Sequence, residues 1–421
     1  MRSKKISVGL TVVLAMFSLT TLMAVARAVA QETVLYNFDC SDVGCEPASN
    51  LIFDAAGNLY GTSPYGGNFH NGVVFELSPQ TSGGWGLAVL HSFNNATGDG
   101  YLPQGGLVSD AAGNLYGTTQ YGGVRNGGTV FELTPSAGGG WTETLLHSFG
   151  TGMGGADGNG PYAGLIFDAA GNLYGTTTYG GTHKLGIAFE LTPGAGGVWT
   201  EKILHTFSGP DGGQPHAGLT LDAAGNLYGT AISGGAYNGG TVFQLTPQAN
   251  GQWAGKLLHS IGQVNGNGVS IDQPYGGVVF DQAGNLYGTT YYGGGSGGGV
   301  VYKLTPSTGG PWKETSVHNL GGAVGANSLA GVVFDSVGNL YGTTLYGGNE
   351  DGDCGSSGCG VVFELRPTTG GSWTESVLVG FNYADGGHPS GSLIFDTAGN
   401  LYGTTSAGGS GVFGTVFKIA H

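Results

Sequence analysis

Apolar and polar residues follow each other along the chain in short segments that favour β-strands over helices. In the stretch that begins at Gly164, the segment between the first two apolar runs reads as a turn, in which Asp168 accepts backbone N–H groups and Gly171 takes a positive φ. A later run stops at Pro193, because proline has no N–H to donate to a sheet. The pattern predicts four strands, at residues 164–168, 173–177, 187–193 and 199–207.

This four-strand unit recurs seven times, at intervals of 54 to 61 residues. Each copy carries a segment close to Phe-Asp-x-x-Gly-Asn-Leu-Tyr-Gly-Thr. Four short antiparallel strands per unit are typical of a β-propeller blade, which must stack on its neighbours to bury its faces. The aspartates of the seven segments are Asp54, Asp110, Asp168, Asp222, Asp281, Asp335 and Asp396.

The two ends of the chain predict how the array closes. The seventh unit stops after its third strand, at residues 416–421, and residues 32–38 resemble the fourth strand at 143–149. We therefore expect an all-β fold, a seven-bladed β-propeller with four antiparallel strands per blade, whose ring is closed by an N-terminal strand that completes the last blade. The repeats start near residues 47, 103, 161, 215, 274, 328 and 389.

The first 30 residues have the form of a secretory signal peptide. A basic start at Arg2, Lys4 and Lys5 precedes an apolar stretch over residues 6–26, and Ala28-Val29-Ala30 supplies a small-x-small cleavage pattern. We expect residues 31–421 to form one exported domain, secreted, periplasmic or at the cell surface, that does not enter the membrane after cleavage and has no C-terminal sorting tail.

Composition narrows the classes of partner. Removing residues 1–30 removes four basic residues and no acidic ones, so the net charge of −15 becomes −19. Such an acidic chain argues against nucleic acid and anionic membrane surfaces as partners. Its 89 glycines recur at fixed places beside aromatic and β-branched residues, which is the chemistry of ordered turns. We expect a monomer.

The four cysteines form two local pairs, each with four residues between its members. In an exported protein such pairs are most simply disulfides that pin loops. A four-cysteine metal site and a cross-pairing between the two loops are the alternatives. The residues are Cys40 with Cys45 and Cys354 with Cys359.

The repeated F-D-x-x-G-N-L-Y-G-T, together with Y-G-G, V-F-E-L-T-P, a tryptophan and L-L-H-S-F, resembles the GloVer tandem repeat of exported "choice-of-anchor" bacterial proteins. The resemblance covers residues 32–421. It implies a β-propeller at the surface or outside the cell, with no established activity to carry over.

Residues that recur in nearly every unit are interpreted as scaffold, because a ring of identical sites rarely performs one task. The seven aspartates above are read as turn caps. Five histidines at one equivalent strand position in different blades are interpreted as structural rather than as a metal cluster; they are His91, His147, His205, His259 and His318. We identify no catalytic residues.

Positions that are equivalent in place but variable in identity are the better candidates. The residue just before each innermost strand follows a proline in six copies and should ring the mouth of the central channel. Tyr162, His216 and Tyr275 come from consecutive blades, and we expect them to form a stacking wall for a sugar or another flat ligand, unless they merely plug the mouth. The predicted ligand-binding residues are Gln104, Tyr162, His216, Tyr275 and Ser390, while Ala48 and Leu329 complete the ring.

An acidic rim lies four residues before the prolines of four copies. Carboxylates of this kind suit Ca²⁺, although Asp-Gly is also a common turn pair. A second candidate cation site is the loop Glu350-Asp351-Gly352-Asp353. The candidate Ca²⁺ ligands are Asp99, Asp157, Asp211 and Asp385.

The sequence favours an exported, non-catalytic binding module that presents one loop face to a glycan or a protein partner. A polysaccharide lyase or hydrolase acting at the channel mouth is the first alternative, with His216, Tyr162 and Asp211 as the nearest approach to a catalytic set. A structural surface protein is the second.

Overall fold

The computed structural model describes residues 30–150, 155–262, 271–348 and 354–420. Residues 1–29 of the predicted signal peptide lie outside this part of the chain. Within the described ranges, no helix is both long enough and apolar enough to span a bilayer.

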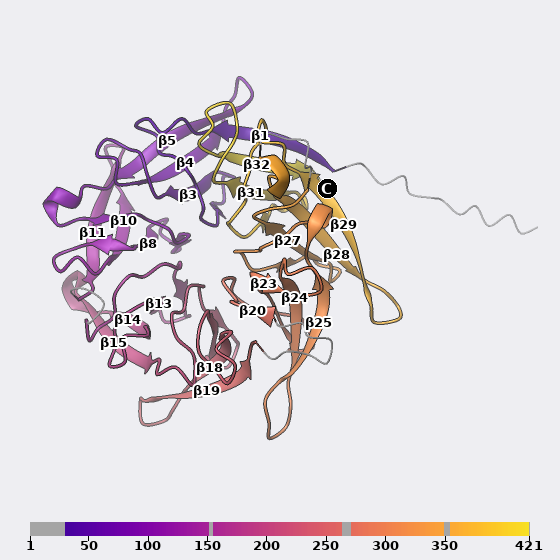
Figure 1. Cartoon of the computed structure of the whole chain (residues 1–421). Helices are drawn as coiled ribbons and strands as arrows, with labels where there is room; N and C mark the ends of the chain where they lie inside the picture. The colour runs from indigo at the N-terminus through magenta and orange to yellow at the C-terminus, as the bar shows by residue number, and fades with distance from the viewer. Residues whose placement is uncertain (1–29, 151–154, 263–270, 349–353, 421) are drawn as a thin grey trace, which may run out of the picture.

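Seven four-stranded antiparallel sheets stand around a central axis as the blades of a propeller (Figure 1). The first three blades contain β2 (Ile52–Phe53), β3 (Leu59–Ser63), β4 (Val73–Pro79) and β5 (Trp85–Ser92); β7 (Val108–Ser109), β8 (Leu115–Thr119), β10 (Thr129–Pro135) and β11 (Trp141–Ser148); and β12 (Ile166–Phe167), β13 (Leu173–Thr177), β14 (Ile187–Pro193) and β15 (Trp199–Thr206).

The next three blades contain β16 (Thr220–Leu221), β17 (Leu227–Ala231), β18 (Thr241–Pro247) and β19 (Trp253–Ser260); β21 (Val279–Phe280), β22 (Leu286–Thr289), β24 (Val300–Thr305) and β25 (Lys313–Asn319); and β26 (Val333–Phe334), β27 (Leu340–Thr344), β28 (Val361–Pro367) and β29 (Trp373–Gly380). The seventh contains β30 (Ile394–Phe395), β31 (Leu401–Thr405), β32 (Thr415–Ala420) and β1 (Gln31–Asn37).

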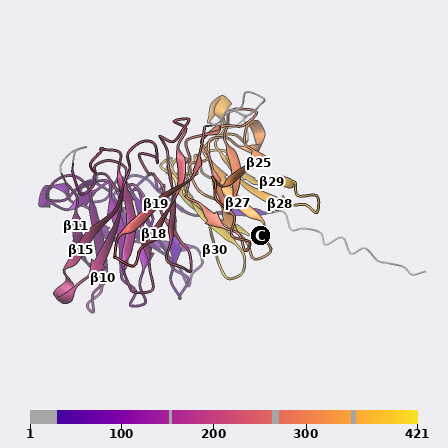
Figure 2. The same cartoon turned by 90° about the horizontal axis from the view of Figure 1, so that it is seen from below.

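Each blade is a meander whose first strand is innermost and whose fourth strand is outermost. The innermost strands are only two residues long, whereas the outermost strands have seven or eight. Seen from the edge, the blades stand side by side around the ring (Figure 2). This arrangement confirms the predicted fold.

The ring closes through the two ends of the chain. Strand β1 pairs antiparallel with β32, with Gln31 opposite Ala420 and Asn37 opposite Thr415. Phe38, which follows β1, is fully buried and packs edge-on against Phe75 of the first blade with ring centroids 5.3 Å apart. The predicted completion of the last blade by the N-terminal strand is confirmed.

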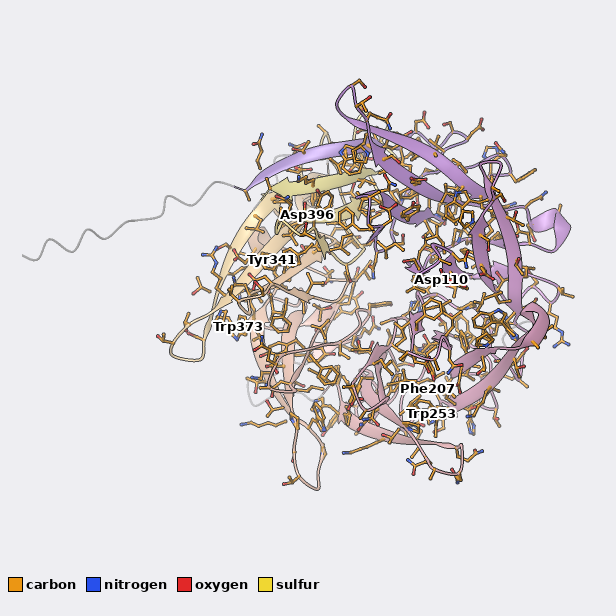
Figure 3. All side chains as sticks on the ribbon, turned by 180° about the vertical axis from the view of Figure 1, so that it is seen from behind. Asp110, Phe207, Trp253, Tyr341, Trp373 and Asp396 are labelled. Atoms are coloured by element: carbon orange, nitrogen blue, oxygen red, sulfur yellow. A yellow bond between two sulfur atoms is a disulfide. The ribbon has the colours of Figure 1, made fainter. Side chains whose placement is uncertain are left out.

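The hairpin between the first two strands of each blade is held by its aspartate. In the second blade, Asp110 Oδ1 accepts the backbone N–H groups of Ala112 and Asn114 at 2.9 Å, and Oδ2 accepts Asn114 Nδ2 and the hydroxyl of Tyr116. Equivalent backbone bonds recur in all seven blades. Figure 3 labels Asp110 and Asp396 at two of these turns. The interpretation of these aspartates as turn caps is confirmed.

A glycine in the second strand of each blade lets an aromatic ring of the third strand lie close against it. A Cβ on Gly229 would lie 2.5 Å from Cζ of Phe243, its neighbour in the register of β17 and β18. Only glycine fits there, because the fully packed interior leaves no room for a methyl group. The other pairs are Gly61–Phe75, Gly117–Phe131, Gly175–Phe189, Gly288–Tyr302, Gly342–Phe363 and Gly403–Phe417.

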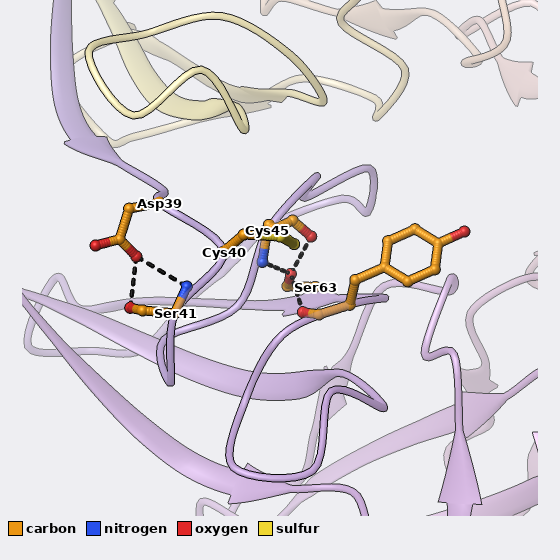
Figure 4. Close-up of a disulfide and its surroundings, with 6 residues drawn as sticks. Asp39, Cys40, Ser41, Cys45 and Ser63 are labelled. Atoms are coloured by element: carbon orange, nitrogen blue, oxygen red, sulfur yellow. Dashed lines mark hydrogen bonds between the residues drawn. A yellow bond between two sulfur atoms is a disulfide. The ribbon is translucent and has the colours of Figure 1, made fainter.

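Both disulfides form within their own loops, Cys40 with Cys45 and Cys354 with Cys359. The Cys40–Cys45 loop leads into the first blade, where the N–H of Cys45 donates to Ser63 Oγ at 2.6 Å (Figure 4). The other lies between β27 and β28. The local pairing predicted from the cysteine spacing is confirmed.

Ring closure can be tested with two matched substitutions. Phe38→Ala and Phe207→Ala each remove a fully buried ring at the end of a fourth strand, which packs edge-on against Phe75 and Phe243 respectively. Because β1 is a true strand of the last blade, we expect both to lower the free energy of unfolding, measured in urea, by about 3–5 kcal/mol. If Phe38→Ala lowers the free energy of unfolding by less than a third of the amount that Phe207→Ala does, β1 does not close the ring in solution.

The close approach of strand and ring can be tested at Gly229. We expect Gly229→Ala to lower the free energy of unfolding by about 1–3 kcal/mol, because the added methyl group collides with Phe243. The control is Gly138→Ala, where a Cβ meets nothing within 4 Å. If urea unfolding gives the same stability for both variants, the predicted collision is wrong.

Candidate functional site

A cavity with a volume of about 450 Å³ occupies the centre of the ring. It is lined by the innermost strands of all seven blades and by the residues that precede them. The structure places the whole ring expected from the sequence on its wall: Ala48, Gln104, Tyr162, His216, Tyr275, Leu329 and Ser390. We call the end of the cavity bordered by these seven residues the mouth.

A repeated backbone conformation aims these side chains at the cavity. Two positions before each of them, the chain adopts a left-handed conformation with φ between 56° and 67°, and in six blades this residue is not glycine. Such strain persists only where surrounding bonds fix it. The residues are Glu46, Leu102, Gly160, Gln214, Gln273, Asn327 and His388.

Hydrogen bonds to two blades hold that conformation. The N–H of Gln214 donates to the carbonyl of Leu185 in the preceding blade at 2.7 Å, and its carbonyl accepts the N–H of Ile232 in its own blade. The same pair of bonds recurs at Leu102 and at Gln273. The mouth position is therefore fixed by the scaffold, while the side chain at that position is free to vary.

Three aromatic residues from consecutive blades lie against each other at the mouth. The ring centroids of Tyr162 and His216 are 4.5 Å apart, and those of His216 and Tyr275 are 5.3 Å apart. We call Tyr162, His216 and Tyr275 the aromatic wall. Tyr275 also contacts Tyr291, which in turn contacts Tyr292, so aromatic surface continues outward from the wall.

The aromatic wall is uncharged at neutral pH. Burial lowers the pKa of His216 to about 4, and burial together with the nearby hydroxyl groups of Tyr275 and Tyr65 raises the pKa of Tyr162. Burial and the hydroxyl groups of Tyr292 and Tyr179 likewise raise the pKa of Tyr275. The wall therefore offers phenol and imidazole groups as neutral hydrogen-bond partners.

Two buried polar atoms at the mouth have no hydrogen-bond partner in the described structure. They are Nδ1 of His216 and Oγ of Ser390. A buried polar atom without a partner costs about 1–3 kcal/mol, so such atoms mark a place where water or a ligand supplies the missing bond. Both belong to residues that line the cavity.

The aspartates expected to form an acidic rim each bind the loop of their own blade junction. Asp99 accepts the N–H of Asn94 at 2.8 Å, Asp157 that of Gly150 at 3.0 Å, Asp211 that of Ser208 at 2.9 Å and Asp385 that of Asn382 at 3.0 Å. No contact recorded among the described residues joins two of these four. Ca²⁺ binding by them stays a prediction, and the second candidate loop, residues 350–353, lies outside the described residues.

Three of these aspartates face a histidine. His91 Nε2 lies 3.1 Å from Asp99 Oδ2, His205 Nε2 lies 2.8 Å from Asp211 Oδ2, and His147 Nε2 lies 3.8 Å from Asp157 Oδ2. The contact with His205 places Asp211, which lies in the loop after β15, beside that outer strand. Among the described residues, no hydrogen bond or ion pair joins it to Tyr162 or His216. The structure therefore does not bring the three residues of the lyase alternative together.

Sequence reasoning missed two kinds of residue. Tyr291 extends the aromatic wall, and the only signal for it was the doubled tyrosine at 291–292. Glu143 and Glu201 approach the histidines of the preceding blade, His91 and His147, at 3.6 and 3.7 Å. The sequence signal for these two residues was a glutamate four positions before the histidine of its own outer strand. This glutamate approaches the histidine of the preceding blade, not that of its own.

Comparison with solved structures shows the fold alone. The extracellular domain of a protein assigned as a hybrid two-component system from B. thetaiotaomicron aligns with a TM-score of 0.50 and 12% identity, over 92% of this chain and 41% of that one. A protein assigned as a 6-phosphogluconolactonase from Bacteroides uniformis gives 0.48 and 14%, over 78% and 83%. A protein assigned as an oxidoreductase (glucose dehydrogenase) from Thermus thermophilus gives 0.45 and 14%, over 93% and 100%.

No curated protein sequence matches the chain. The model of one family, described as the Gloeobacter/Verrucomicrobia repeat, matches three overlapping stretches, residues 9–156, 138–352 and 255–421. These stretches include every blade of the ring. The chain belongs to the Gloeobacter/Verrucomicrobia repeat family.

Proposed function

We propose that this protein is an exported, non-catalytic binding propeller that holds a neutral glycan at the mouth of its central cavity. The observation that carries the proposal is the aromatic wall, together with two unpartnered polar atoms that line the same cavity, Nδ1 of His216 and Oγ of Ser390. Aromatic faces stack on the apolar faces of sugar rings, while neutral donors and acceptors bind the hydroxyl groups.

Charge supports a neutral ligand. The residues that line the cavity include no aspartate, glutamate, lysine or arginine among those the structure describes. The chain as a whole carries a net charge of −15, which repels acidic polysaccharides. Glycosidases commonly use a pair of carboxylates, and the described lining of this cavity contains no such pair. Binding without cleavage is therefore the better proposal.

Export rests on the sequence of residues 1–30 and on the two disulfides, since disulfides persist in oxidising compartments outside the cytosol. A binding surface at the mouth of a propeller outside the cell meets free or surface-attached glycans directly.

The proposal is tested by removing the aromatic wall. A glycan array identifies the ligand, and calorimetry compares the wild type with the triple variant Tyr162→Ala, His216→Ala and Tyr275→Ala. We expect at least a tenfold loss of affinity, because three stacked or hydrogen-bonding groups are lost. The control is Tyr237→Ala, which removes a half-exposed tyrosine that does not line the cavity, and which should leave affinity within twofold. Unchanged binding by the triple variant would mean that the ligand sits elsewhere.

The pH dependence of binding gives a second test. Because burial holds the pKa of His216 near 4, its imidazole is neutral both at pH 5 and at pH 8. We expect the affinity of the wild type for its glycan to change less than twofold between these values. A tenfold change centred near pH 6.5 would show that His216 titrates like an exposed histidine and is not buried as described.

A further inference from the structure

Two neighbouring junctions on the outer side of the ring carry the same mixed set of side chains. In each, a histidine comes from the outermost strand of one blade, a glutamate from the outermost strand of the next, and an aspartate from the loop that connects them. At the junction of β5 and β11 the set is His91, Glu143 and Asp99; at the junction of β11 and β15 it is His147, Glu201 and Asp157.

The spacing of the first set matches that of metal ligands. Nε2 of His91 lies 3.1 Å from Oδ2 of Asp99 and 3.6 Å from Oε2 of Glu143, and all three ligand atoms lie within 4.8 Å of one another. Zinc bonds of about 2.0–2.1 Å to nitrogen and oxygen place tetrahedral ligand atoms about 3.3 Å apart. The two separations from Nε2 of His91 bracket that value.

One buried atom of the first set lacks a hydrogen-bond partner, although Asp99 and Glu143 are hydrogen-bonded to each other. The single N–H that His91 offers at Nε2 faces two carboxyl groups, and Oε1 of Glu143 is buried with no hydrogen-bond partner. Asp99 is only 8% exposed. Two carboxyl groups therefore approach the same imidazole nitrogen in a partly buried setting, where like charges repel. A divalent cation among them removes that repulsion.

The remaining junctions show that the scaffold does not require the set. At the junction of β15 and β19, His205 keeps Asp211, but Gly255 stands where the glutamate would be. His259 bonds Glu314 at 2.8 Å, and the sequence has Ser270 in place of the aspartate. Each of the other three junctions lacks at least one member of the set. Tyr36 and Leu87 stand in place of the histidine and the glutamate at one, and Val324 stands in place of the aspartate near His318 and Glu375 at another. At the third, Val379 stands in place of the histidine, with Glu32 and Asp385 present.

We propose that His91, Asp99 and Glu143 bind one divalent transition-metal ion, of which Zn²⁺ is the best fit, and that His147, Asp157 and Glu201 form a weaker second site. Imidazole nitrogen together with two carboxylates suits zinc better than calcium, which prefers oxygen ligands alone. Three protein ligands leave one tetrahedral position for water. The ion would join two blades, and the proposal is independent of glycan binding at the mouth.

The ranking of the two sites follows from Arg125. Its Nη1 lies 3.9 Å from Oδ2 of Asp157, so a positive charge already faces the second set and opposes a metal ion there. The histidine of that set is also farther from both carboxylates, at 3.8 and 3.7 Å. No lysine or arginine contact is recorded for the first set in the described part of the chain.

Equilibrium dialysis of the metal-stripped protein against Zn²⁺, with Co²⁺ absorption as a readout of coordination, tests the proposal. We expect at least one bound equivalent and a tetrahedral Co²⁺ spectrum. Glu143→Gln keeps the shape of the side chain but removes a ligand, and should lower affinity at least tenfold. The matched control is Glu314→Gln, the same change at the equivalent strand position of an incomplete junction, which should leave affinity within twofold.

A further variant, Arg125→Ala, should strengthen binding of a second equivalent, because it removes the opposing charge. Near-ultraviolet circular dichroism checks that each variant is folded, and Asp99→Asn provides a second ligand change should Glu143→Gln fail to fold. The proposal is overturned if the wild type binds no Zn²⁺ at micromolar concentration, if the ligand variants bind as tightly as the wild type, or if Glu314→Gln weakens binding equally.

Discussion

The pairing of β1 with β32 is the interaction on which the rest of the structure depends. Without it the last blade would have three strands and an unpaired edge, and the junction with the first blade would lose Phe38. With it, Phe38 packs against Phe75 across the closing junction as Phe207 packs against Phe243 elsewhere. The cavity and its mouth exist because the array is a ring and has no ends.

The residues of each blade fall into two classes. Those that recur hold the sheet together: the aspartate of the first hairpin, the glycine under an aromatic ring and the tryptophan that begins most outer strands. The mouth position belongs to the second class. A left-handed residue bonded to two blades fixes its place, so the backbone of this position is the same whichever side chain it carries. Figure 3 shows Phe207, Trp253, Tyr341 and Trp373 among the packed side chains between blades.

Charge is distributed unevenly between the centre and the edge of the ring. The described lining of the cavity is uncharged, and burial keeps His216 neutral. The outer junctions instead bring histidines and carboxylates together in a partly buried setting, where unlike charges attract strongly and like charges repel. A neutral ligand at the mouth and a cation at the junctions are therefore separate possibilities with separate chemistry, and one does not depend on the other.

The repeat pattern by itself determined the strands, the number of blades, the closing strand, the turn caps and the position of the mouth, because each depends on local hydrogen bonding or on periodicity along the chain. Only the tertiary structure decided that Tyr291 continues the aromatic wall and that Glu143 meets His91 and Asp99. Those contacts join residues of different strands and blades, and their distances depend on how neighbouring sheets twist against each other. No pattern along one chain specifies that angle.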